Sequence, residues 1–418
     1  MNADSTSEST SAKSTPARLR LRPARATRLR PRPARATRLR LRPATTMHVR
    51  YRDDLRLFPN RLRRAALAGL ILVWAFIPVL WDVPPFTLLS GNGISLNTLA
   101  YAGVFSIAAI GLNLLTGYTG QVSLGHSVFL AVGAYSTAYV GSVWGWPMWL
   151  WIFFAPALGW LVGAAIGPFA LRLRGNYLVI VTLGLVFIGE HIFRNWKSVT
   201  GGNTGTSAAG VELNLGFVDF ENLSLFGKSF GKDESYFWLI WFLVAVVAWL
   251  TKNVVRTRPG RALQAVRDRD IAAEIIGIDV GIAGYKTQAF AWSAAIAALA
   301  GALYAPLQLF ISPGDFTLLV SIQFIAMIIL GGMGTIYGSI IGALVITALP
   351  RFIDGISADY GVPGVAAKST DSGLVSVASL NVIIYGFLIA LFLLVEHRGL
   401  AGIWVRIRNY FSTWPFSY

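Results

Sequence analysis

The sequence predicts an all-α membrane protein whose chain crosses the bilayer about ten times. Three observations support this fold class: hydrophobic residues make up 55% of the 418 residues, charged residues make up only 13%, and the apolar residues gather in long runs. A soluble domain has about 25% charged residues, because it needs a polar surface that this composition does not supply. The same composition therefore argues against a soluble enzyme.

Ten segments have the apolar character and approximate length of a membrane-spanning helix. Such a helix needs about 20 residues to cross a hydrocarbon core of roughly 30 Å. The eighth and ninth segments are short, so a hairpin that does not fully cross is the alternative for this pair, and eight spans would keep the same parity. In chain order, the segments are 65–81, 94–115, 122–142, 147–171, 176–193, 236–252, 287–311, 317–332, 335–350 and 379–396.

The Lys and Arg residues between these segments predict that both termini lie in the cytoplasm. Cytoplasmic loops carry an excess of positive residues, whereas the short loops 82–93, 143–146 and 312–316, predicted to be external, carry none. The long external loops are poorer than the internal ones, with four Lys or Arg residues in 194–235 and two, Arg351 and Lys368, in 351–378. An even number of spans places the C-terminus on the side of the N-terminus. The predicted internal positions are Arg172, Arg174, Lys252, Arg256, Arg258, Arg261, Arg267, Arg269, Lys286, Arg398, Arg406 and Arg408.

Residues 1–60 are predicted to form a disordered, Arg/Pro-rich arm, because they cannot bury enough apolar surface to fold. The arm contains the repeat RPARATRLR at 22–30 and again at 32–40. Three explanations remain open: an extension upstream of a true start at Met47, a polybasic segment on anionic lipid headgroups, or a nucleic-acid-binding segment. The last is the weakest, since the repeat has no aromatic side chains on which bases could stack. We therefore expect the lipid bilayer, and no nucleic acid, as a partner.

A few polar residues inside the predicted spans are candidates for a translocation pathway: Asn113, Ser123, His126 and Glu190. The first three lie in the Gly-rich stretch GLNLLTGYTGQVSLGHSVFLAVGAY at 111–135. Small residues there indicate either close helix packing or irregular backbone beside a pathway, and hydrogen bonds between helices are the alternative role for Asn113 and His126. Glu190 lies about 21 Å along its predicted span, where a carboxylate marks a cavity, a partner, or a side chain that reaches the headgroups.

Several chemical signatures are missing from the sequence. It has no phosphate-binding G-x-x-x-x-G-K-[ST] motif, no cysteine, no metal-ligand spacing among its four histidines, and no series of acidic residues through the spans. We therefore predict no catalytic residue, no metal and no cofactor in this chain. If transport consumes energy, that energy must come from another protein.

The longest predicted cytoplasmic loop, 253–286, reads NVVRTRPGRALQAVRDRDIAAEIIGIDVGIAGYK. Its apolar and charged residues alternate with a pattern that predicts a short amphipathic helix, with Gly277 as its end. Such a helix suits docking into a groove on another protein. An interfacial helix on the inner leaflet is the alternative.

Four segments, taken in order, resemble the LivM-type permeases of branched-chain amino acid ABC importers. They are the 111–135 stretch, RTRPGRALQAVRDRDIAAEIIGID at 256–279, GGMGTIYGSIIGA at 331–343 and EHRGLAG at 396–402. The resemblance implies the ABC importer permease fold for residues 61–405, followed by a cytoplasmic tail at 406–418. It also implies a bacterial plasma membrane location, a second LivH-like permease, two cytoplasmic ABC ATPases that bind the ATP, and an extracytoplasmic substrate-binding protein.

The resemblance also implies which residues contact an ATPase: Gly260, Arg261, Ala272, Ala273 and Gly277. The two alanines and Gly277 match the A-A-x-x-x-G core of ABC permeases. The expected solute is a branched-chain or other hydrophobic amino acid, with urea or short amides as the alternative within the superfamily. A secondary transporter or channel working alone is the other alternative, although it would have no use for the 253–286 loop.

Overall fold

The computed structural model describes residues 94–170, 177–214, 230–279, 284–360 and 399–413, with short stretches and single positions elsewhere after residue 68. The N-terminal arm, 1–60, lies outside the described residues. The first and last predicted spans, 65–81 and 379–396, lie mostly outside them. All eight predicted spans between these two contain a helix, which confirms the all-α fold class for the described part of the chain.

Five of the described helices are long and apolar enough to cross a membrane. They are α4 (Leu96–Thr119), α6 (Met148–Ala170), α7 (Tyr177–Asn195), α9 (Lys232–Arg256) and α12 (Tyr285–Gln308). Two others, α5 (His126–Ser142) and α13 (Leu318–Gly331), are shorter. The eighth is α14 (Ile336–Tyr360), which at 25 residues is about 37 Å long. This helix is therefore longer than the predicted span 335–350.

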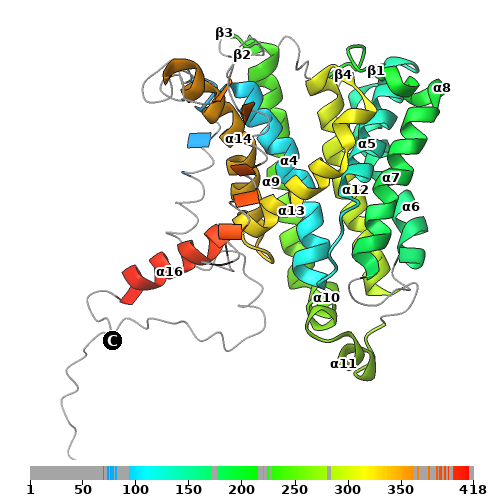
Figure 1. Cartoon of the computed structure of the whole chain (residues 1–418), viewed down its shortest axis with the longest axis vertical. Helices are drawn as coiled ribbons and strands as arrows, with labels where there is room; N and C mark the ends of the chain where they lie inside the picture. Colours follow the sequence, from blue (N-terminus) through cyan, green and yellow to red (C-terminus); the bar gives the residue numbers. More distant parts are fainter. Residues whose placement is uncertain are drawn as a thin grey trace, which may run out of the picture. The chain divides into compact units, whose positions relative to one another are not determined.

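Helices α4 and α12 form the centre of the bundle. In α4, 83% of the membrane-length window is buried, and in α12 78%, whereas in α6, α7 and α9 the value is 28%. Helix α12 packs against α4, α5 and α6, while α4 also packs against α9 and α14, and Figure 1 shows α4 in cyan between its neighbours. The described chain thus leaves most of the residues in the windows of α6, α7 and α9 uncovered.

Small residues allow the central helices to approach closely. A Cβ atom built on Gly301 of α12 would lie 1.9 Å from the carbonyl oxygen of Leu130 in α5. The same construction on Gly133 of α5 gives 1.9 Å to the carbonyl oxygen of Ala298. At Gly133, therefore, the packing interpretation of the small-residue run is confirmed, because no side chain fits between the two backbones.

The predicted span 122–142 begins too early, because α5 starts only at His126. Helix α4 ends at Thr119, and Gly120 follows in the left-handed conformation at φ 72°. The connecting backbone is held by side chains rather than by helix hydrogen bonds: Leu124 N donates to Thr182 Oγ1 at 3.0 Å, and Gly125 N donates to Ser123 Oγ at 3.2 Å. Ser123 and Gly125 are buried, so polar side chains replace the missing helical hydrogen bonds there.

The predicted amphipathic helix of the 253–286 loop is two helices in the structure. Helix α10 (Arg258–Asp268) and helix α11 (Asp270–Ile275) are separated by Arg269, whose backbone is extended at φ −159° and ψ 112°. Gly277 follows α11 at φ 85°, so the predicted end of the helical segment is confirmed. The prediction of one helix failed because the apolar pattern continues across the break.

Short elements complete the described fold. Helix α8 (Lys197–Thr200) and the 3-10 turn η1 (Gly202–Thr204) lead into β1 (Thr206–Ser207), which pairs antiparallel with β4 (Phe310–Ile311) in the register Thr206 to Ile311. The turn η2 (Pro313–Phe316) follows β4, and α16 (Gly399–Thr413) packs on α13 and α14. The predicted boundary between permease domain and tail, 405/406, therefore falls inside α16. Two other strand pairs are β2 (Ser224–Leu225) with β3 (Lys228–Ser229), and β5 (Val365–Ala366) with β6 (Val375–Ser376).

Candidate solute pathway and coupling segment

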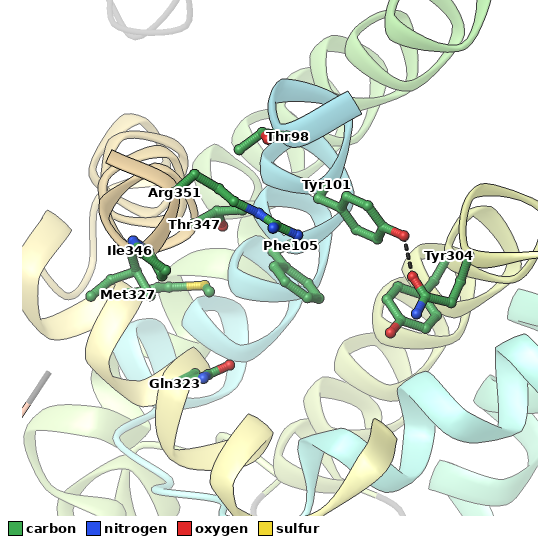
Figure 2. Close-up of a pocket in the computed structure, with 11 residues that line it drawn as sticks. Thr98, Tyr101, Phe105, Tyr304, Gln323, Met327, Ile346, Thr347 and Arg351 are labelled. Atoms are coloured by element: carbon green, nitrogen blue, oxygen red, sulfur yellow. Dashed lines mark hydrogen bonds between the residues drawn. The ribbon is translucent and has the colours of Figure 1, made fainter. Parts of the chain in front are cut away.

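A cavity of about 320 Å³ lies between α4, α12, α13 and α14 (Figure 2). Its size is at the lower end of the range of 300–1,000 Å³ that is usual for small-molecule sites. All four helices contribute side chains, so any movement of one helix against the others changes its shape. The lining residues are Thr98, Tyr101, Phe105, Tyr304, Gln308, Gln323, Met327, Ile346, Thr347, Pro350 and Arg351.

One wall of the cavity is aromatic. Tyr101 and Phe105 are four residues apart on α4 and so share a face of that helix. Their rings lie 5.9 Å and 6.2 Å from the ring of Tyr304 on α12. The Tyr101 hydroxyl donates a hydrogen bond to the side-chain oxygen of Gln308, which Figure 2 shows as a dashed line. This wall therefore joins α4 to α12 and offers apolar surface to a solute.

The opposite side of the cavity, on α13 and α14, carries the charge. Arg351 extends from α14 toward the α4 side chains (Figure 2). Among the described residues, no ion pair or hydrogen bond involves its guanidinium group. Thr347, one turn earlier on α14, has a buried hydroxyl oxygen without a hydrogen-bond partner. Polar groups buried without partners are rare in native structures and need an explanation.

None of the candidate pathway residues predicted from the sequence lines this cavity. Asn113 instead binds the turn between α13 and α14, since its Oδ1 accepts from Gly334 N at 2.8 Å and its Nδ2 donates to Thr335 O at 3.0 Å. Ser123 holds the α4–α5 connection, as described above. His126 is buried, with its Nε2 at 3.5 Å from Ser293 Oγ of α12. The contacts of Asn113 and His126 match the alternative of hydrogen bonding between helices.

Glu190 has an ion-pair partner on its own helix. Its Oε1 lies 2.6 Å from Arg194 Nη2, and Arg194 Nη1 donates to Asn203 Oδ1 at 3.0 Å. Asn203 belongs to η1, so the pair links α7 to the glycine-rich segment that leads into β1. Glu190 was expected to mark a cavity, to have a partner, or to reach the headgroups. The structure shows a partner, Arg194, within this chain.

Helices α10 and α11, which we name the coupling segment after the role expected from the sequence, lie at the end of α4 that is remote from the cavity (Figure 1). The apolar face of α10 is buried within this chain: Leu263 packs in a cluster with Leu114, Tyr118 and Phe290. Gly260 lies so close to the end of α9 that a Cβ would be 2.2 Å from Val255 O. Among the residues implied as ATPase contacts, Gly260 is thus part of the internal packing, while Arg261 is exposed.

Helix α11 presents an apolar surface that the described chain leaves uncovered. Ile271, Ile275 and Ile276 are 62%, 80% and 74% exposed. Ala272 is exposed as well, whereas Ala273 is 2% exposed and faces the protein. We name Ile271, Ile275 and Ile276 the isoleucine patch. Exposed apolar groups of this kind beside charged residues are typical of protein contacts.

A single ion pair fixes α11 to α12 among the described residues. Lys286 Nζ lies 3.2 Å from Asp270 Oδ2. Partial burial raises the pKa of Asp270, but the hydrogen bond and the charge of Lys286 lower it more, so the net pKa of this carboxyl is below its usual range. The pair is therefore formed at neutral pH.

Comparison with known proteins identifies the family. The family model described as "Branched-chain amino acid transport system / permease component" matches residues 94–395. The chain belongs to this permease family. It is therefore a multi-pass membrane protein of a transport family, in agreement with its five apolar helices of membrane-spanning length. The match includes both the cavity and the coupling segment.

Three relatives are named as permeases of branched-chain amino acid transport systems. The high-affinity branched-chain amino acid transport permease LivM of Escherichia coli K12 is 31% identical over 301 residues, which cover 69% of this chain and 67% of LivM. LivM of Salmonella typhimurium LT2 is 32% identical over 65% of this chain and 64% of its own length. The permease LivH of E. coli K12 is 26% identical over 61% of this chain and 82% of LivH. The chain thus spans about two thirds of the two LivM proteins.

No solved structure matches the chain. Arg351 was predicted to lie in an external loop, because the apolar run ends at Pro350, but α14 continues through both residues. The position of Arg351 directly after an apolar run was the one sequence signal for this site. Nothing in the sequence indicated which helices would face Arg351.

Proposed function

We propose that this chain is the permease subunit of an ABC importer that carries branched-chain or other hydrophobic amino acids across the bacterial plasma membrane. A second LivH-like permease, two cytoplasmic ATPases and an extracytoplasmic substrate-binding protein would complete the importer. ATP would bind to the ATPases, so this chain itself needs no cofactor. Two findings support the proposal: the family match across 94–395, and relatives whose names specify branched-chain amino acid transport.

One structural observation supports a mechanism in which a partner protein drives movement at the cavity. Helix α4 contributes Tyr101 to the cavity and, 16 residues later, accepts a hydrogen bond at Gly117 O from Arg267 of α10. Sixteen helical residues correspond to about 24 Å. A rigid, largely buried helix can therefore carry a displacement of the coupling segment to the cavity. This arrangement suits alternating access driven by a partner protein outside the membrane.

The proposed orientation follows from the charges of the predicted loops. With both termini in the cytoplasm, α10 and α11 lie on the cytoplasmic side and the cavity lies in the outer half of the bilayer. A solute released by an external binding protein would then meet Tyr101, Gln308 and Arg351 first. The isoleucine patch of α11 would contact an ATPase.

The central experiment is reconstitution of the chain with its partner subunits in proteoliposomes. We expect the ATPases to copurify with the permease pair and leucine uptake to require both ATP and the binding protein. The variant Ile275→Asp places a charge in the isoleucine patch and should reduce ATPase binding by at least tenfold. Gln264→Asp, which adds the same charge to the exposed face of α10, should have a smaller effect.

Two results would contradict the proposal. Leucine uptake by the chain alone, without ATPases, would favour a secondary transporter or channel. ATP-driven uptake of urea or a short amide, with no uptake of leucine, would favour the alternative branch of the superfamily. Normal ATPase binding by Ile275→Asp would show that α11 does not contact the ATPase. It would not affect the proposed solute.

A further inference from the structure

We infer that Arg351 binds the carboxylate of the transported solute and thereby restricts the pathway to solutes with a free carboxyl group. The inference rests on the proposed function, because it concerns the same cavity. It adds the chemistry of recognition, which neither the family match nor the names of the relatives supply.

The first step concerns the charge of Arg351. An ionised side chain among membrane helices normally pairs with another group or faces a polar pathway. Arg351 is exposed and lines the cavity, and within the described part of the chain no carboxylate forms an ion pair with it. A guanidinium group can bind a carboxylate through two parallel hydrogen bonds. An anionic group in the cavity would thus supply the missing partner.

The second step concerns the hydroxyl group of Thr347. Thr347 and Arg351 are four residues apart on α14, so their side chains share one face of the helix. The Thr347 Oγ1 atom is buried and has no hydrogen-bond partner, yet the residue lines the cavity. A hydroxyl group beside a guanidinium can donate to the same carboxylate. The two groups together form an anion site on one helix.

The third step concerns the rest of the solute. Phe105, Tyr304, Met327 and Ile346 supply apolar and aromatic surface to the same cavity. Figure 2 shows Arg351 between the α14 residues and the aromatic wall on α4 and α12. A solute with a carboxylate at one end and a branched apolar group at the other satisfies both surfaces. Urea or a short amide would leave the guanidinium without a counter-charge.

The absence of cysteine from the chain makes a charge-replacement experiment possible. The variant Arg351→Cys is assembled with cysteine-free partner subunits and assayed for leucine uptake in proteoliposomes. We expect uptake to fall about 10- to 100-fold, as for the loss of a charged hydrogen bond. Reaction with 2-aminoethyl methanethiosulfonate restores a positive charge and should recover most of the uptake. The anionic 2-sulfonatoethyl reagent should not.

Arg194→Cys is the matched control, because Arg194 also lies on an apolar helix but pairs with Glu190 and does not line the cavity. Uptake by this variant should respond equally to the two reagents. Saturating leucine should also slow the labelling of Arg351→Cys several-fold. If both reagents give the same uptake at position 351, or if Arg351→Cys transports normally, the assignment of Arg351 is wrong.

A second variant remains informative if Arg351→Cys does not assemble. Thr347→Val keeps the shape of the side chain and removes its hydroxyl group, so we expect the KM for delivered leucine to rise about three- to tenfold. Thr347→Ser should keep the original KM, and an unchanged KM in Thr347→Val would overturn the anion site. If the unmodified complex shows no ATP-driven uptake of leucine, the proposed function itself fails, which is a separate outcome.

Discussion

The guanidinium group of Arg267 donates a hydrogen bond of 2.7 Å from Nη1 to the carbonyl oxygen of Gly117. This contact joins α10 to the last turns of the central helix α4. One turn earlier on α4, Asn113 binds Gly334 and Thr335 in the turn between α13 and α14. The coupling segment, α4 and the α13–α14 pair therefore meet at one place, and two of them also line the cavity.

The Arg267 contact predicts an uncoupled variant. Arg267→Met keeps the length of the side chain but removes the donor, so we expect normal ATPase binding and at least a tenfold lower ratio of leucine uptake to ATP hydrolysed. Hydrogen bonds to charged groups contribute about 1.5–3 kcal/mol. Arg269→Met, at the exposed break between α10 and α11, is the control. An unchanged ratio in Arg267→Met would show that this contact transmits no movement.

Asn113 predicts a loss of stability. The variant Asn113→Leu removes both a donor and an acceptor from the α13–α14 turn and leaves Gly334 N unpaired, whereas Thr335 O keeps its hydrogen bond from Ser339 N. We expect destabilisation by about 1–3 kcal/mol, the cost of one unsatisfied group. The thermal unfolding midpoint of the detergent-solubilised protein measures this change. Asn195→Leu, at an exposed position on α7, should unfold at the original temperature.

The Asp270–Lys286 pair predicts a dependence on pH. Because the pKa of Asp270 is lowered in the folded protein, the pair contributes at neutral pH, and its contribution is lost as the pH falls through that lowered pKa. The protection factors of the α11 amides, which correct for the pH dependence of intrinsic exchange, should therefore be constant between about pH 5 and 8, where a carboxyl with an ordinary pKa near 3.9 is already ionised. Asp270→Asn should speed exchange at pH 7.

Asp268→Asn serves as the control for that measurement. Asp268 is exposed at the end of α10, so its substitution should leave exchange in α11 unchanged. Lys286→Gln should reproduce the effect of Asp270→Asn. Equal exchange in all three variants and the original protein would mean that the pair does not hold α11.

Gly301 predicts a failure of folding. The variant Gly301→Leu would force a side chain against the α5 backbone, because even a Cβ atom lies 1.9 Å from Leu130 O. Overpacking of a core costs about 1–3 kcal/mol where side chains can adjust, and a backbone carbonyl adjusts less. We expect little monodisperse protein by fluorescence-detected size-exclusion chromatography. Gly184→Leu should express normally, since nothing lies within 4 Å of its Cβ position.

Much of the fold could be predicted because the bilayer is a simple solvent. Apolar runs of a fixed length are required to span it, so the predicted segments 94–115 and 287–311 correspond closely to α4 and α12. Gly277 ended the coupling segment as expected, because it adopts a left-handed conformation that favours glycine. These features depend on local sequence alone.

The break at Arg269 and the late start of α5 could not be predicted in this way. Both depend on groups distant in the sequence: Lys286 of α12 binds Asp270 beside the break, and Thr182 of α7 accepts from Leu124 before α5. Hydropathy does not record such partners. For the same reason, Asn113 and His126 could be picked out as unusual polar residues, but their roles could not be assigned.

The sequence by itself determined the class of protein, the family, and the approximate position of most of the described helices. Only the tertiary structure decided which residues surround the cavity. Tyr101, Tyr304, Gln323 and Arg351 lie on four helices spread over some 250 residues, so no local pattern connects them. They form one site because helix packing, fixed by close backbone contacts such as Gly301 on Leu130, brings distant faces together.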